Sequence, residues 1–315
     1  AKMLVDGAIE KHQKMIKQMR GVPGVQPERF KEAFTVRHCA LSLVGEPIMY
    51  PEINKFLDLL HAKSISSFLV TNAQFPERIR QLHPCTQLYV SIDAATKDSL
   101  KAVDRPLFND FWERFIASLK ALKGKNITRT VYRLTLVKDW NMQDVSAYCK
   151  LLAIGLPLLI EIKAVTFCGD SKASSLTIKN TPYHEEVSSF GLEICKTYSK
   201  MYPESERRYE LACEHEHSNC ILIADTKLKV EGKWHTWIDY DKFHSLFQEW
   251  KESGKTFSAF EYLAPTPDWA VFGAKEQGFD PDEVRVRKKG KKAKADAAAA
   301  AAAAKEAKEA KEAQK

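Results

Sequence analysis

The sequence predicts an α/β protein built on a parallel sheet, either a partial TIM-like (β/α)6 barrel or an open doubly wound sheet. Three observations support this fold class. Apolar stretches of strand length alternate with helices from residue 38 to residue 201, which is typical of right-handed βαβ units. Polar side chains gather at the C-terminal ends of the predicted strands, where ligands bind in such folds. No GxGxxG follows any of these strands, which disfavours a dinucleotide-binding fold.

The predicted elements follow one another in regular order. A helix over residues 1–20 comes first, because apolar side chains recur on one of its faces. Five strands follow, at residues 38–44, 66–72, 87–93, 130–137 and 158–167. The helices after them are predicted at residues 51–62, 76–82, 108–123, 142–154 and 182–201. Two further strands, at residues 209–224 and 227–238 with a turn near Glu231 and Gly232, and a helix at residues 239–251 complete the pattern.

Composition limits the function classes. The formal charge of +7 owes much to residues 285–294, which hold seven basic side chains, so it is a weak argument for nucleic-acid binding. No stretch approaches the roughly 20 apolar residues of a membrane span. The seven cysteines are odd in number and form no CxxC pair, which suits a reducing compartment such as the cytoplasm.

We expect two parts in the chain. Residues 1–285 form the barrel with a C-terminal extension, and residues 286–315 form a basic, low-complexity tail rich in Ala, Lys and Glu. The tail has almost no apolar side chain larger than Ala, so we expect it to be solvated. A weak RNA contact through its basic residues is the alternative.

The end of the first strand is the leading candidate site. Gly45 lets a ligand approach the backbone, Pro47 fixes the turn, and Glu46 presents an anion to a cation such as an amino group. The alternative is an ordinary turn with a solvated glutamate. Polar residues at the ends of the other strands extend the site: Thr71, Asn72, Ser91, Asp93, Lys138 and Thr166.

Several of these segments resemble one known family. Residues 38–52, 68–75, 87–107, 129–138 and 214–223 are together similar to the radical S-adenosylmethionine (radical-SAM) tRNA 4-demethylwyosine synthases of the wybutosine pathway. The resemblance covers nearly all of residues 1–285. It implies a radical-SAM barrel and a carbon–carbon lyase activity. That activity joins N1-methylguanosine-37 of tRNA-Phe to a two-carbon unit of pyruvate, forming 4-demethylwyosine.

The resemblance also implies roles for individual residues. Gly45, Glu46 and Pro47 would bind the amino group of S-adenosylmethionine, and Ser91 and Asp93 its ribose or carboxylate. Thr71 and Asn72 end the neighbouring strand. A further set could contact a pyruvate-derived anion, the substrate or tRNA: Arg133, Lys138, Lys163, His215, His217 and Asn219.

The sequence departs from the family in one respect. Radical-SAM chemistry needs a Cys-x3-Cys-x2-Cys loop that holds a [4Fe–4S] cluster, and this spacing does not occur here. We therefore expect the first strand, the cluster loop, the pyruvate-binding lysine and the FMN domain of eukaryotic members to lie upstream. An electron donor is implied as well. The alternative is a catalytically inactive tRNA-binding fragment or paralogue.

A zinc site is a rival interpretation of the late histidines. Cys213, His215 and His217 alternate along a predicted strand, which would place them on one face, and Cys220 follows closely. The other interpretations are a hydrogen-bonded polar strand near the substrate, or a contact to tRNA.

The missing cysteine motif gives a direct prediction. Residues 1–315, reconstituted anaerobically with iron and sulfide, should bind no stoichiometric [4Fe–4S] cluster, because three suitably spaced thiolates are lacking. Iron counting and the visible absorbance of the cluster are the measurements. About four irons per chain would contradict the expectation.

Overall fold

The computed structural model describes residues 1–42, 45–169 and 175–283. Residues 1–21 and 25–281 form one compact unit, which contains the strands and helices of the described chain. The expected tail, residues 286–315, lies outside the described residues, so its boundary and its solvation stay predictions. Among the described helices, none is long and apolar enough to cross a membrane.

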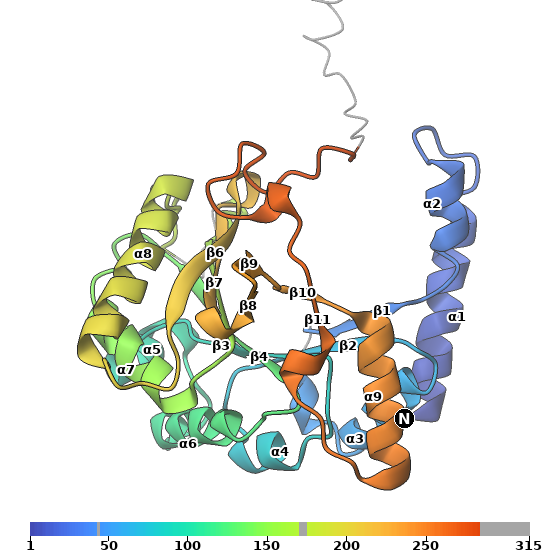
Figure 1. Ribbon diagram of the computed structural model, residues 1–315, viewed down its shortest axis with the longest axis horizontal. Helices are drawn as coiled ribbons and strands as arrows, with labels where there is room; N and C mark the ends of the chain where they lie inside the picture. The colour runs from blue at the N-terminus through green and yellow to red at the C-terminus, as the bar shows by residue number, and fades with distance from the viewer. Residues whose placement is uncertain (43–44, 170–174, 284–315) are drawn as a thin grey trace, which may run out of the picture. The chain divides into compact units, whose positions relative to one another are not determined.

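A seven-stranded sheet organises the unit (Figure 1), with the order β1-β2-β3-β4-β5-β7-β6. Strands β1 to β5 pair in parallel, whereas β7 is antiparallel to both β5 and β6. The five parallel strands were predicted, although β1 is shorter than expected. The strands are β1 His38–Leu41, β2 Ser66–Thr71, β3 Gln87–Ser91, β4 Arg129–Leu136, β5 Leu159–Ala164, β6 Tyr209–His215 and β7 Cys220–Asp225.

Helices connect the strands as the sequence predicts. The predicted helices are confirmed as α1 Lys2–Gln18, α3 Ile53–His61, α4 Pro76–Gln81, α6 Phe111–Lys123, α7 Val145–Gly155, α8 His184–Met201 and α9 Tyr240–Ser253. Two further helices were not predicted, α2 Pro27–Glu32 and α5 Lys97–Asp104. Short 3-10 helices include Pro47–Met49, Ile178–Asn180, Glu216–Ser218 and Ala259–Tyr262.

The prediction of one strand over residues 209–224 is wrong. The chain turns back at the 3-10 helix Glu216–Ser218, and β6 and β7 form an antiparallel hairpin. Asn219 closes the turn in a left-handed conformation with φ of 46°, which asparagine tolerates better than most residues. The expected strand 227–238 is also wrong. It is divided into β8 Lys229–Val230, β9 Lys233–Trp234 and β10 Trp237–Ile238, and β10 pairs with β11 Leu263–Ala264.

The sheet separates two apolar cores. Alternate residues of β4, such as Tyr132 and Leu134, enter the larger core together with α3 to α8. Val131 belongs to the second core, on the other face, with Phe243 and Phe247 of α9. The C-terminal extension therefore covers part of the inner face that a barrel would enclose.

This covering lies at the N-terminal ends of the strands. The hydroxyl of Tyr262 accepts a hydrogen bond from the N–H of Arg129 at 2.9 Å, at the start of β4, and lies 3.2 Å from the carbonyl of Thr86. The N–H of Ala259 donates to the carbonyl of Asn126 at 2.9 Å. The opposite end of the inner face, where β1 to β5 finish, is left for ligands.

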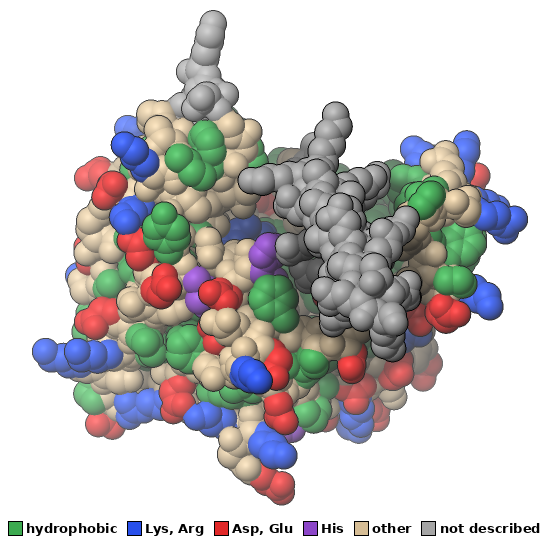
Figure 2. Space-filling model, turned by 90° about the horizontal axis from the view of Figure 1, so that it is seen from above, with side chains coloured by type: hydrophobic (Ala, Val, Ile, Leu, Met, Phe, Trp, Pro, Cys, Tyr) green, Lys and Arg blue, Asp and Glu red, His purple; other side chains and the backbone are tan. Residues whose placement is uncertain are grey.

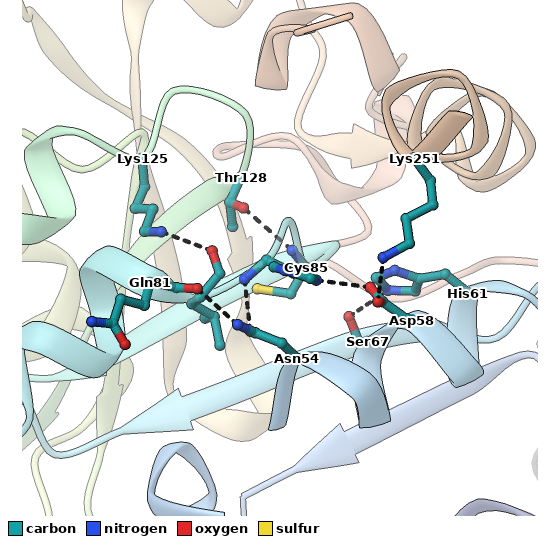
Figure 3. Close-up of polar contacts among 11 residues, drawn as sticks. Asn54, Asp58, His61, Ser67, Gln81, Cys85, Lys125, Thr128 and Lys251 are labelled. Carbon is teal, nitrogen blue, oxygen red and sulfur yellow. Dashed lines mark hydrogen bonds and ion pairs between the residues drawn. The ribbon is translucent and has the colours of Figure 1, made fainter. Parts of the chain in front are cut away.

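A polar network fastens α9 to this end of the sheet (Figure 3). Asp58 of α3 accepts bonds from Lys251 of α9 at 2.6 Å and contacts the His83 ring at 2.9 Å. The buried His61 ring contacts the Ser67 hydroxyl at 2.8 Å and packs edge-on against Phe247. Burial, together with the nearby His244, lowers the pKa of His61 to about 3.

We expect His61 to make the fold sensitive to acid. The unfolded state takes up a proton on this histidine near pH 6.5, whereas the folded state resists it down to about pH 3. Stability is therefore lost as the pH falls, by about 2 kcal/mol between pH 7 and pH 5 from this group alone. Urea unfolding of wild type and His61→Gln at both pH values measures it. Equal pH dependence in the two proteins would contradict the assignment.

Candidate functional site

A pocket of about 610 Å³ opens at the C-terminal ends of the first three strands. Five residues predicted from their strand-end positions line it together: Gly45, Glu46, Asn72, Ser91 and Asp93. These five residues lie at one rim because parallel strands end at the same edge of a sheet, and their role in binding stays a prediction. Gly45 has a left-handed φ of +70°, and no atom of the described residues lies within 4 Å of the position that a Cβ atom would take. Its backbone is thus open to a ligand.

Glu46 has a half-satisfied carboxylate. Its Oε2 atom accepts a hydrogen bond from the N–H of Asn72 at 2.8 Å, whereas its Oε1 atom is buried without a partner in the described part of the chain. Burial raises the pKa of Glu46, although the Asn72 N–H and the Thr71 hydroxyl favour the ionised form. A buried carboxylate oxygen with no donor is costly, so a ligand that supplies a cationic donor would bind here favourably.

Two further carboxylates face the same pocket. Burial raises the pKa of Asp93, and the charges of Arg133 and Lys163 oppose this. The pKa of Asp104, which lines the pocket from the end of α5, is raised to about 7 by burial and by the charge of Asp93. The cavity is lined by three acidic residues and one basic residue, Arg105, and this excess of acidic groups favours a ligand with positive charge.

Much of the remaining pocket lining is apolar. It includes Phe75, Leu100, Phe108 and Phe111. Phe75 and Phe108 contact edge to face with ring centroids 5.8 Å apart, and the Arg114 guanidinium lies 4.2 Å from the centroid of Phe108. A cavity lined by both acidic groups and aromatic rings suits a ligand that joins a cationic group to a flat ring.

Sequence reasoning missed Leu100 and Asp104 because it did not predict α5, and it did not assign the helix predicted at residues 108–123, which includes Phe108 and Phe111, to the site. A signal was available: Thr96 caps the helix, accepting a hydrogen bond from the N–H of Ser99 at 3.3 Å, and this side-chain spacing marks a helix start. Two other predicted residues do not line the pocket. Thr71 is buried behind Glu46, and Pro47 begins the 3-10 helix Pro47–Met49.

Arg133 and Lys163 lie on the inner face of the sheet beside the pocket. Arg133 of β4 pairs in register with Ser91 of β3, and Lys163 of β5 contributes to the electrostatics of Asp93. Lys138 does not join them. Its ammonium group is paired with Glu186 of α8, and its N–H donates to the carbonyl of Asn180 at 2.8 Å.

The late histidines occupy the hairpin turn between β6 and β7. His215 contacts the Ser218 hydroxyl at 2.8 Å, and Asn219 donates to the carbonyl of Pro182 at 3.4 Å. The rings of His215 and His217 lie 5.2 and 5.9 Å from the ring of Phe279. An aromatic cluster of this kind offers stacking area to a base.

The zinc interpretation is wrong for the described residues. β6 ends at His215, so His217 does not share a strand face with Cys213. Burial raises the pKa of Cys213 to about 11 and that of Cys220 to about 12, which keeps both thiols protonated at neutral pH. Throughout residues 1–42, 45–169 and 175–283, no three His, Cys, Asp or Glu side chains are grouped to hold a metal ion.

Acidic and basic side chains are interspersed on the surface drawn in Figure 2. A broad surface of one sign would attract a polyanion at long range. The mixed charges on this face do not support nucleic-acid binding through overall charge, which the sequence also supports only weakly.

Comparisons with known proteins give consistent results. A model described as "Radical SAM superfamily" matches residues 25–152, and one described as "Wyosine base formation" matches residues 154–225. The chain is 61% identical over 293 residues to the S-adenosyl-L-methionine-dependent tRNA 4-demethylwyosine synthase of Danio rerio, covering 92% of this chain and 39% of that protein. The protein of this name from Homo sapiens is 62% identical over 291 residues, with 92% and 38% covered. The chain therefore spans less than half the length of these relatives.

Solved structures confirm the predicted radical-SAM type of fold. The structure of TYW1 with a lysine–pyruvate adduct bound aligns with a TM-score of 0.61 and 26% identity, covering 73% of this chain and 71% of that one. Archaeal TYW1 aligns with a TM-score of 0.57 and 26% identity, covering 73% and 72%.

The unpaired oxygen of Glu46 leads to a prediction on stability. Because burial raises the pKa of this carboxyl, its ionised form costs folding free energy at neutral pH. Glu46→Gln should therefore stabilise the fold at pH 7.5 by roughly 1 kcal/mol. The gain should vanish near pH 4, where Glu46 is protonated in the folded protein. Urea unfolding measures it, with the exposed Glu77→Gln as the matched control. Destabilisation at pH 7.5 would contradict the prediction.

Proposed function

The chain is homologous to part of the radical-SAM tRNA 4-demethylwyosine synthases, and we propose that it carries the cofactor-binding wall of such an enzyme. The proposed activity joins N1-methylguanosine-37 of tRNA-Phe to a two-carbon unit of pyruvate, forming 4-demethylwyosine as a carbon–carbon lyase. The observation that carries the proposal is the acidic pocket at the strand ends, with the buried, unpartnered Oε1 atom of Glu46 inside it.

S-adenosylmethionine fits the chemistry of this pocket. Its ammonium group would supply the donor that Glu46 Oε1 lacks, and the open backbone at Gly45 lets the methionine moiety approach. Ser91 and Asp93 would bind hydroxyl groups of the ribose. The aromatic wall around Phe75 and Phe108 would take the adenine ring. Asp93 and Asp104 would hold the positive charge of the sulfonium in a favourable potential.

When bound, S-adenosylmethionine supplies the radical chemistry of this superfamily. The residues of this chain bind and orient it, and the pocket walls shield it from water. The [4Fe–4S] cluster that the superfamily implies does not fit this chain, because the described residues offer no group of three metal ligands. The cluster ligands are therefore not assigned to residues of this chain.

The other reactants are proposed from the homology. A related structure contains a lysine–pyruvate adduct, which supports pyruvate as the carbon donor. Arg133 and Lys163, beside the pocket, would contact the substrates, and the turn at His215, His217 and Asn219 would contact the tRNA. An electron donor is required, with FMN in a separate domain, and free thiols suit a cytoplasmic enzyme.

The pocket also distinguishes this proposal from a fragment that only binds tRNA. A cavity in which Glu46, Asp93 and Asp104 outnumber the single basic residue, Arg105, does not favour a polyanionic RNA, because like charges repel. The acidic cavity is explained by a cationic small molecule. The geometry therefore favours a cofactor-binding role.

Removing the acidic groups should weaken cofactor binding. In the whole gene product with its cluster, Glu46→Gln and Asp93→Asn should each weaken S-adenosylmethionine binding about tenfold or more, because each loses a charge-assisted hydrogen bond of roughly 1.5–3 kcal/mol. Isothermal titration calorimetry under anaerobic conditions measures the dissociation constant.

Glu77→Gln is the control for this measurement, because it removes an acidic group on α4 outside the pocket. Its dissociation constant should stay within twofold of wild type. Unchanged affinity in Glu46→Gln would exclude the assigned role of Glu46.

A further inference from the structure

An ion pair on the inner face of the sheet is not used by the proposed cofactor site. Arg133 of β4 and Glu161 of β5 are directly opposite in the parallel register, and Arg133 Nε lies 3.2 Å from Glu161 Oε1. Arg133 is also the register partner of Ser91, which lines the pocket. The pair therefore lies one strand beyond the wall of the cofactor pocket.

The two side chains are accessible and incompletely bonded. Their exposed fractions are 32% for Arg133 and 25% for Glu161, whereas the flanking Tyr132, Leu134 and Ile160 are buried on the opposite face. The Nε atom of Arg133 is buried and makes no hydrogen bond within the described residues, because its approach to Glu161 is poorly aligned. Donors of the guanidinium and an oxygen of Glu161 thus remain available for a ligand.

Stability alone does not explain this pair. A partly exposed ion pair contributes little, and taking its charges from water costs free energy that a misaligned contact does not recover. An apolar pair at these positions would extend the core residues Val131 and Leu159, which lie one step below on the same two strands. The pair instead places a donor beside an acceptor, on strands roughly 4.8 Å apart.

Space for a flat ring lies next to the pair. A cavity of about 380 Å³ is lined by Glu161, Tyr89, Leu159 and Leu222 and extends toward Arg129 and Thr236; Arg133 is not one of its lining residues but lies directly beside Glu161. Tyr89 lies two residues before Ser91 on β3, and Leu222 of β7 is the register partner of Glu161. The cavity therefore gives aromatic and aliphatic contact area close to a charged donor and a charged acceptor, as a nucleobase needs.

Resting on the proposed function, we propose that Arg133 and Glu161 recognise the N1-methylated guanine base. Arg133 donates to the carbonyl oxygen O6, and Glu161 accepts from the exocyclic 2-amino group. These two groups flank N1 on one edge of the base, so binding separates Arg133 from Glu161, which are 3.2 Å apart without a ligand, and the methyl group needs no partner of its own. An adenine presents an amino group where Arg133 requires an acceptor, and is rejected.

Two RNA probes separate the roles of the two residues. They are anticodon stem-loops of tRNA-Phe with N1-methylguanosine or with N1-methylinosine at position 37, the second lacking only the 2-amino group. Wild-type protein should bind the first about tenfold more tightly, as expected for one charge-assisted hydrogen bond. Glu161→Leu should reduce this preference below twofold. Arg133→Met should weaken the binding of both RNAs about tenfold, because both bases carry O6. The preference for N1-methylguanosine over N1-methylinosine should remain.

Controls make the outcomes distinguishable. Glu210→Leu removes a glutamate from another surface ion pair, with Lys229, and should keep the tenfold preference. Melting temperatures show whether each variant folds. The double variant Arg133→Met with Glu161→Leu removes both charges of the pair, so no unpaired charge is left to destabilise the fold. A retained preference in Glu161→Leu would overturn the base-recognition proposal alone. Failure of the wild-type protein to prefer N1-methylguanosine over adenosine at position 37 would overturn both it and the proposed function.

Discussion

A buried guanidinium at the start of the central strand holds the C-terminal chain against the sheet. Arg129 is 2% exposed, and its side chain donates to the Gln87 side chain at 3.0 Å and to the carbonyls of Thr236 and Trp237 at 2.6 and 3.1 Å. A buried charge is costly without such partners, so these bonds are strongly interdependent. With the Tyr262 contact, they determine which end of the inner face is closed and which is open.

The residues on the inner face of the sheet form successive layers along the strands. The lowest layer is closed by Arg129 and the C-terminal extension, and Val131 and Leu159 form an apolar layer above it. The following layer brings Ser91, Arg133 and Glu161 into register across three strands. Since a strand presents alternate residues to one face, the layers follow one another in steps of two residues. The apolar layer therefore separates the polar contacts of Arg129 from the polar layer nearer the pocket.

The pocket combines features that folding alone would not favour. Burial raises the pKa of Glu46, Asp93 and Asp104, and the charge of Asp93 adds to the effect at Asp104. Perturbed acidic groups in one cavity are typical of binding sites, where the ligand provides the missing charge. The homology to radical-SAM tRNA 4-demethylwyosine synthases agrees with this, because their cofactor is cationic at two positions. Geometry and homology are independent arguments for one ligand class.

The sequence alone determined the parallel strands, most of the helices and the rim position of Glu46, Asn72, Ser91 and Asp93. These depend on local periodicity and on the rule that parallel strands end at one edge. Only the tertiary structure decided that Asp104 joins the pocket, that Lys138 is paired elsewhere and that His217 lies in a turn. The physical reason is that each of these depends on where a connecting segment folds back in space. Local pattern does not encode that position, because contacts distant in the sequence set it.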